Sequence, residues 1–105
     1  MIIVDVTRCP LGQHNYVVLE NENGEVIIFS DDVRHFPSRK DLLTHYECES
    51  GLDARCLGGG LISIDYKNKV IHIREDGEEA EHEMDMTDIV LSLKGEYPEF
   101  NVTEG

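Results

Sequence analysis

The chain has 105 residues, which is enough for one domain with a small hydrophobic core but not for two. Its 22 Asp and Glu residues against nine Lys and Arg residues give a net charge of −13, which repels nucleic acid and anionic membranes, so we expect neither as a partner. No apolar stretch approaches the ~20 residues of a membrane span, and Cys9, Cys48 and Cys56 form no disulfide or metal-binding pattern, so we expect a cytoplasmic protein.

The first 30 residues are predicted to form three strands. Met1–Val6 is a short apolar run, and the Cys9–Gly12 sequence after it is rich in turn-forming residues. Asn15–Glu20 and Glu25–Ser30 are apolar and β-branched, and they are joined through Asn23-Gly24, a dipeptide that favours a tight β-hairpin. Both runs are apolar at successive positions, so we expect central strands of a sheet that is covered on both faces.

A helix is predicted to begin after Pro37. Ser38 is a suitable N-cap, and Asp41, three residues later, completes the start signal of a helix. Ser50-Gly51 provides the stop, because glycine readily adopts the left-handed conformation that ends many helices. The predicted buried stripe of this helix consists of Leu42, Leu43 and Tyr46.

The second half is predicted to contain a long hairpin, a second helix and a last strand. Apolar and polar residues alternate from Ala54 to Arg74, with a turn at Lys67–Lys69. Thr87 or Asp88 is expected to cap the helix, and Tyr97-Pro98 to end it before a strand at Phe100–Thr103. The apolar residues of this helix are Ile89, Val90, Leu91 and Leu93. We therefore expect one α/β domain over residues 1–105, with a mixed sheet of about six strands and one helix on each face.

His35 is the strongest candidate for chemistry, because it stands at the entrance to the first helix. Backbone N–H groups at this entrance, such as that of Phe36, and the positive end of the helix dipole favour an anion. Arg34, Arg39 and Lys40 bring three of the nine cationic residues close to His35. A neutral imidazole in this position can serve as a general acid or base on a phosphoryl group, and the alternative is an ordinary surface histidine.

Other polar residues have simpler explanations. His45 and Glu49 lie one helical turn apart, but no further metal ligands occur at a recognisable spacing, so a solvated helix face is expected. His72 lies between two isoleucines of a strand, where a structural role is usual. Gly58–Gly60 lacks the spacing of a dinucleotide site, and we expect a β-bulge or close backbone packing there. We expect neither a metal nor a cofactor.

Two stretches of the second half form a recognisable pattern. Cys56-Leu57-Gly58-Gly59-Gly60 is followed by Ile62-Ser63 and then by Lys69-Val70-Ile71-His72-Ile73, and the chain later reads Tyr97-Pro98-Glu99-Phe100-Asn101-Val102-Thr103. These stretches resemble the CLGGGxIS…KxIHV core and the YPDYEVT ending of the phosphohistidine phosphatase (Janus/Ocnus) family. The resemblance covers Cys56 to Thr103 and, more loosely, Tyr16 to Ser50.

This resemblance implies a six-stranded sheet with a helix on each side, and removal of phosphate from phosphohistidine in proteins without metal or cofactor. The family's catalytic histidine lies just before the first helix, which is the place of His35. His35 would then be the general base that activates water, or the group that takes the phosphoryl group itself. The phosphate-binding residues would be Arg34, Phe36, Arg39 and Lys40, with Asn15 and Gly77 at positions where the family holds phosphate.

The chain also departs from the family's pattern. Asn15, Ile27 and Leu61 stand where the family has one lysine and two arginines. Two functions from different classes therefore remain open. The first is a protein phosphohistidine phosphatase that acts on a phosphohistidine-containing protein or peptide. The second is a non-catalytic binding domain whose acidic segment, Glu75–Asp88, contacts a basic protein partner; otherwise this segment is a solvated loop.

Overall fold

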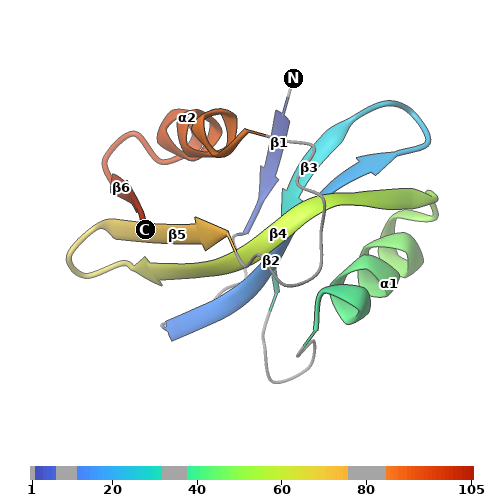
Figure 1. Cartoon of the computed structure of the whole chain (residues 1–105), viewed down its shortest axis with the longest axis horizontal. Coiled ribbons are helices and arrows are strands. Elements are labelled where there is room, and N and C mark those ends of the chain that lie inside the picture. The colour runs from blue at the N-terminus through green and yellow to red at the C-terminus, as the bar shows by residue number, and fades with distance from the viewer. Residues whose placement is uncertain (1, 7–11, 32–37, 76–84) are drawn as a thin grey trace.

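The structure is a computed structural model of the chain and describes residues 2–6, 12–31, 38–75 and 85–105. In these residues the chain forms six strands and two helices (Figure 1). The strands are β1 (Ile2–Asp5), β2 (Gly12–Asn21), β3 (Val26–Phe29), β4 (Ala54–Asp65), β5 (Val70–Glu75) and β6 (Asn101–Glu104). The helices are α1 (Arg39–Ser50) and α2 (Met86–Glu96).

The described strands lie in one mixed sheet with the order β1-β3-β2-β4-β5-β6. The four central strands pair antiparallel, through the β2–β3 and β4–β5 hairpins and the long pairing of β2 with β4. The outer strands add in parallel, β1 beside β3 and β6 beside β5. A parallel pair needs a connection that crosses over, and α2 supplies it between β5 and β6.

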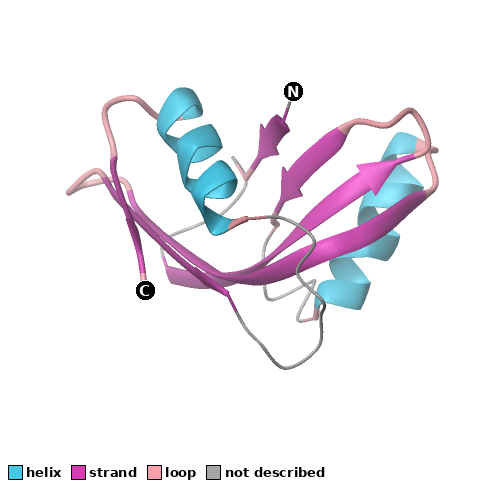
Figure 2. Cartoon of the chain, turned by 45° about the horizontal axis from the view of Figure 1, so that its top comes forward, coloured by secondary structure: helices cyan, strands magenta, loops and turns pink. Residues whose placement is uncertain are grey.

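Hydrophobic clusters form on both faces of the sheet, and each is covered by its own helix (Figure 2). α2 covers one face, where Ile89 and Leu93 pack against alternate strand residues. The fully buried strand residues on this face are Tyr16, Val18, Ile28, Ile62, Ile64, Ile71 and Ile73. α1 covers the other face, where the buried Leu42 packs against Val17, Leu19, Ile27 and Phe29. The predicted α/β architecture, with one helix on each face, is confirmed.

The β2–β3 hairpin turns where the sequence predicts it. Gly24 has a φ of +80°, which glycine adopts without strain. The side-chain oxygen of Asn21 accepts hydrogen bonds from the backbone N–H groups of Asn23 and Glu25, each at 3.0 Å. Its amide group donates to the Glu25 carboxylate at 3.0 Å and to the Tyr46 hydroxyl of α1 at 3.2 Å. Asn21 thus links the hairpin to the helix.

Two predictions about the elements are wrong. α2 is capped by Asp85, which accepts a hydrogen bond from the Thr87 N–H at 3.0 Å, and not by Thr87 or Asp88. The earlier start adds Met86 to the residues that pack against the α2 cluster. Of the apolar residues of this helix, Ile89 and Leu93 are buried, whereas Leu91 is 59% exposed. β2 already begins at Gly12, where it pairs with Ile64, so this residue is not part of a turn; residues 9–11 lie outside the described residues.

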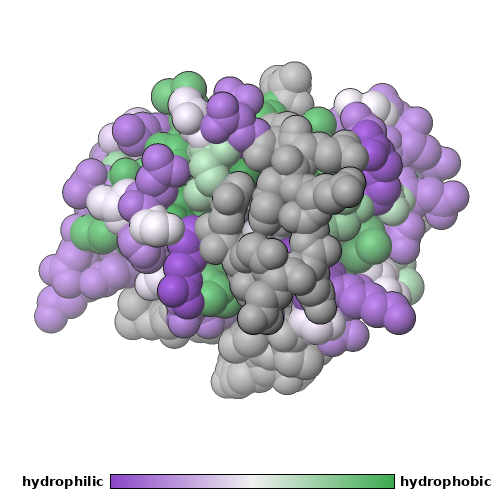
Figure 3. Space-filling model, viewed as in Figure 1, coloured by the Kyte–Doolittle hydropathy of each residue, from purple (hydrophilic) through white to green (hydrophobic). Residues whose placement is uncertain are grey.

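The surface is largely polar, as the acidic composition suggests. Hydrophilic residues cover both ends of the face shown in Figure 3. Among the described residues, the large hydrophobic side chains exposed to solvent are Ile3, Tyr66 and Leu91. Neither described helix is long and apolar enough to cross a membrane.

Candidate functional site

Some residues of the predicted phosphate site lie within the described structure and some do not. His35, Arg34, Phe36 and Gly77 lie outside the described residues. Asn15 lies in β2, and Arg39 and Lys40 are the first two residues of α1. The described part of the candidate site therefore consists of the start of α1 and the neighbouring face of the sheet.

α1 begins with the capping arrangement that the sequence predicts. The Ser38 Oγ accepts a hydrogen bond from the Asp41 N–H at 3.2 Å, and the Ser38 hydroxyl donates to Oδ2 of Asp41 at 2.8 Å. The N–H groups of a first helical turn point out of the helix start and attract anions. The carboxylate of Asp41 lies in the same turn and competes with an external anion for this attraction.

The side chain of Arg39 lies on the sheet at Gly59 of β4. A Cβ atom at Gly59 would lie 2.9 Å from Cδ and 3.3 Å from Nε of Arg39, and 2.6 Å from the backbone oxygen of Tyr16. Only glycine leaves room for both neighbours. The close packing predicted for the glycine run is therefore present at Gly59. A bulge lies directly before the glycine run, between Val18 and Leu19 in the pairing of β2 with β4, and Leu57 is the extra residue.

A row of three residues crosses the sheet next to this contact. Asn15 of β2 is the register partner of Leu61 in β4, and Leu61 is the partner of Arg74 in β5. The three side chains lie on the α1 face, because the residues that alternate with them, such as Ile62 and Ile73, are buried on the α2 face. We call this set the Asn15–Leu61–Arg74 row. Asn15 therefore lies on the same face of the sheet as the Arg39 side chain, while Lys40 is exposed in the first turn of α1.

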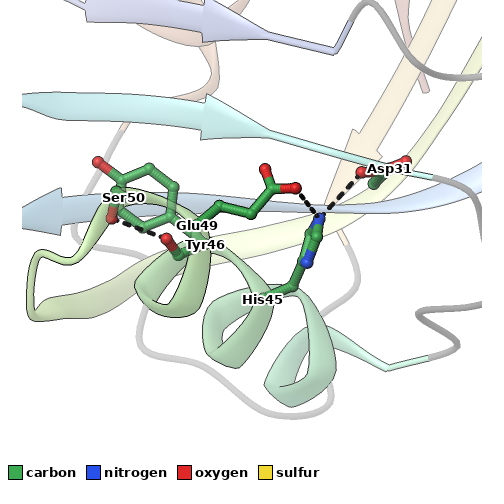
Figure 4. Close-up of polar contacts among 5 residues, drawn as sticks. All are labelled: Asp31, His45, Tyr46, Glu49 and Ser50. Carbon is green, nitrogen blue, oxygen red and sulfur yellow. Dashed lines mark hydrogen bonds and ion pairs between the residues drawn. The ribbon is translucent and has the colours of Figure 1, made fainter.

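His45 lies in a largely buried polar contact that the sequence did not predict (Figure 4). Its Nε2 atom is 3.2 Å from Oδ2 of Asp31 and 3.4 Å from Oε1 of Glu49. The side chains of His45 and Asp31 are only 17% and 10% exposed, and the imidazole also lies against the Phe29 ring. The expected solvated helix face is therefore wrong for His45. The spacing of one helical turn predicted the proximity of Glu49 to His45, but no local sequence pattern predicted the contact with Asp31.

The other polar candidates have local partners. Nδ1 of His72 lies 2.9 Å from Oγ1 of Thr103 across β5 and β6, in keeping with a structural role. Cys48 and Cys56 are free thiols, both exposed, and Cys9 lies outside the described residues. Within the described ranges, no group of three or more His, Cys, Asp or Glu side chains is arranged to hold a metal ion.

Two hollows lined by described residues lie away from the candidate site. One, of about 220 Å³, is lined by residues of the β2 end and the α1–β4 connection, and another of the same volume by residues 96–100. None of the predicted phosphate-binding residues lines either hollow. The described part of the candidate site is a polar area on the sheet beside the start of α1. No family model matches the chain, and no curated protein matches it closely enough to count as a relative.

Proposed function

We propose that the chain is a metal-free protein phosphohistidine phosphatase, with His35 as the general base and the start of α1 as part of the phosphate site. The observation that carries this proposal is the contact between Arg39 and β4 at Gly59. It brings a guanidinium group from the helix start onto the same face of the sheet as Asn15. The resemblance of the Cys56–Ile73 stretch to phosphohistidine phosphatases supports the same function.

The proposed reaction transfers a phosphoryl group from an imidazole nitrogen to water. His35 accepts a proton from the attacking water while the new O–P bond forms. The P–N bond breaks, its electron pair returns to the imidazole of the substrate, and a proton taken up by that imidazole completes the step. Arg39, Lys40 and the N–H groups of the first helical turn offset the negative charge on the phosphoryl oxygens.

The test is the rate at which His35→Ala removes phosphate from a phosphohistidine peptide. Loss of a general base should lower the rate by roughly 10²–10⁴-fold, with little change in stability. If His35 instead takes the phosphoryl group, the loss should be nearly complete and a phosphorylated form of the unmodified protein should be trappable. His72→Ala, which breaks the contact with Thr103, is the control. A folded His35→Ala variant with unchanged activity would refute the assignment.

A second candidate function is a non-catalytic domain that binds a basic partner. Two of the three residues in the Asn15–Leu61–Arg74 row are uncharged, and the chain has a net charge of −13. This function predicts no dephosphorylation of any phosphohistidine peptide, including basic ones. It also predicts binding of a Lys- and Arg-rich peptide that weakens steeply as salt is added.

A further inference from the structure

Arg74 lies on the same face of the sheet as Arg39. In β5, Ile71 and Ile73 are fully buried on the α2 face, and Arg74 follows Ile73, so Arg74 extends over the α1 face, where it is exposed. Its register partner is Leu61, and Gly59 is two residues before Leu61 on the same face of β4. Gly59 and Arg74 are therefore diagonal neighbours, whose backbones lie about 7–8 Å apart.

This separation allows the two arginine side chains to reach one ligand. The Cδ and Nε atoms of Arg39 lie over Gly59, so the Arg39 side chain lies on the same face of β4 as Arg74. Long side chains on diagonal neighbours of a sheet can contact each other or a common group. Two guanidinium groups brought close together repel each other, and an anion between them removes the repulsion.

The charges around Arg74 also favour an anion. In the described part of the chain, Arg55 pairs with Glu20 at 2.9 Å and Lys69 with Glu99 at 2.8 Å, whereas Arg74 forms no hydrogen bond or ion pair with a described residue. The register neighbours of Arg74 along this face, Leu61, Ser63 and His72, carry no carboxylate. In a chain with a net charge of −13, Arg74 is an exposed cation whose described register neighbours on this face carry no carboxylate.

We propose that Arg74 and Arg39 together bind a phosphoryl group on the α1 face of the sheet, one guanidinium coming from β5 and the other from α1. The planar, forked donors of arginine match the oxygens of phosphate. The identity of the phosphoryl group as phosphohistidine rests on the proposed function, whereas the binding of phosphate does not. Leu61 of β4 is uncharged, and Arg74 of the neighbouring strand β5 supplies a positive charge beside it.

The first test is a titration with inorganic phosphate that is monitored through the amide chemical shifts in NMR spectra. In the unmodified protein we expect the largest shifts around Arg39, Gly59 and Arg74. Arg74→Gln should weaken phosphate binding by about 10- to 100-fold, since it removes charged hydrogen bonds. Arg55→Gln is the matched control: it removes an exposed arginine that pairs with Glu20, changes the net charge equally and should alter the affinity less than about twofold.

The second test moves the guanidinium across the register pair. Arg74→Leu should lose phosphate binding as Arg74→Gln does, and the double variant Leu61→Arg/Arg74→Leu should recover most of it. The recovery is expected because residues 61 and 74 lie opposite each other on the same face. Circular dichroism and urea unfolding show whether each variant is folded, and Arg74→Lys serves as a milder replacement if Arg74→Gln is not.

The outcomes separate this inference from the proposed function. Unchanged phosphate affinity in Arg74→Gln, or no phosphate binding by the unmodified protein, overturns the inference. Turnover of phosphohistidine that depends on His35 but not on Arg74 overturns it too, and leaves the proposed function in place. Phosphate binding that depends on Arg74 in a protein without phosphatase activity supports the inference and rejects the proposed function.

Discussion

The imidazole of His45 and the carboxylate of Asp31 tie α1 to the end of β3, with 3.2 Å between Nε2 and Oδ2. Both side chains are largely buried, and Glu49 lies 3.4 Å from the same nitrogen. A carboxylate with little exposure to water depends on its hydrogen-bond donors, because it has lost most of its hydration. This contact is therefore expected to affect stability more than a surface ion pair would.

His45→Ala is expected to lower the free energy of unfolding by about 1–3 kcal/mol, since the Asp31 carboxylate loses a donor. His45→Gln, which keeps an N–H donor of similar length, should recover part of this loss. Urea unfolding measures both values, and the exposed His72 provides the matched control His72→Ala. Equal stabilities of His45→Ala and the unmodified protein would contradict this account.

Gly59→Ala and Gly95→Ala are expected to have opposite effects on stability. A methyl group at Gly59 meets the backbone oxygen of Tyr16 and the side chain of Arg39, so the sheet must shift, at a cost of about 1–3 kcal/mol. A methyl group at Gly95 of α2 meets nothing within 4 Å, and alanine favours a helix over glycine by about 0.5–1 kcal/mol. Thermal unfolding of the two variants makes the comparison. If Gly59→Ala raised the free energy of unfolding, the close contact of Gly59 with Tyr16 and Arg39 would be refuted.

Asn21→Ala is expected to destabilise the fold by about 2–4 kcal/mol. The variant removes the acceptor of two backbone N–H groups and the donor to Glu25 and Tyr46, at a site that is only 5% exposed. Asn101→Ala on the exposed β6 surface should change stability by less than about 0.5 kcal/mol. Chemical unfolding gives both values, and similar losses in the two variants would argue against the role of Asn21.

Asn68→Ala is expected to raise the pKa of Asp65 towards its ordinary value of 3.8. The amide of Asn68, followed by backbone N–H groups in the β4–β5 turn, lowers the pKa of this carboxyl in the folded chain. A lowered folded pKa contributes stability above pH 3.8, and this contribution is lost as the pH falls through the folded pKa. An NMR titration of the Asp65 carboxyl carbon tests the shift. An identical titration curve in Asn68→Ala would exclude this cause.

Chelators, and serine replacements of Cys9, Cys48 and Cys56, are expected to leave any dephosphorylating activity unchanged. In the proposed mechanism every role belongs to a histidine, an arginine, a lysine or a backbone N–H group. The assay of phosphohistidine peptides is repeated with EDTA and with each cysteine variant. Loss of activity with EDTA, or in one cysteine variant that remains folded, would overturn the proposed mechanism.

Local signals in the sequence predicted α1 and both hairpins, because a capping box, an Asn-Gly turn and a glycine stop act within a few residues. The cap of α2 was not predicted correctly, since Asp85, Thr87 and Asp88 are all suitable caps. The contact of His45 with Asp31 joins residues 14 positions apart in different elements, so it depends on how α1 packs. The Asn15–Leu61–Arg74 row depends on the register of three strands, which the extra residue Leu57 shifts, and no local pattern gives that register.

The Asn15–Leu61–Arg74 row also bears on how such a chain can change over evolution. Its residues alternate along β2, β4 and β5 with the buried residues under α2, so the same strands carry both sets on opposite faces. A substitution in the row replaces no residue that packs under α2, so the charge on one face can change without a change in the core on the other face. A lineage with this sheet can therefore gain, lose or relocate a charge between adjacent strands while it keeps its core.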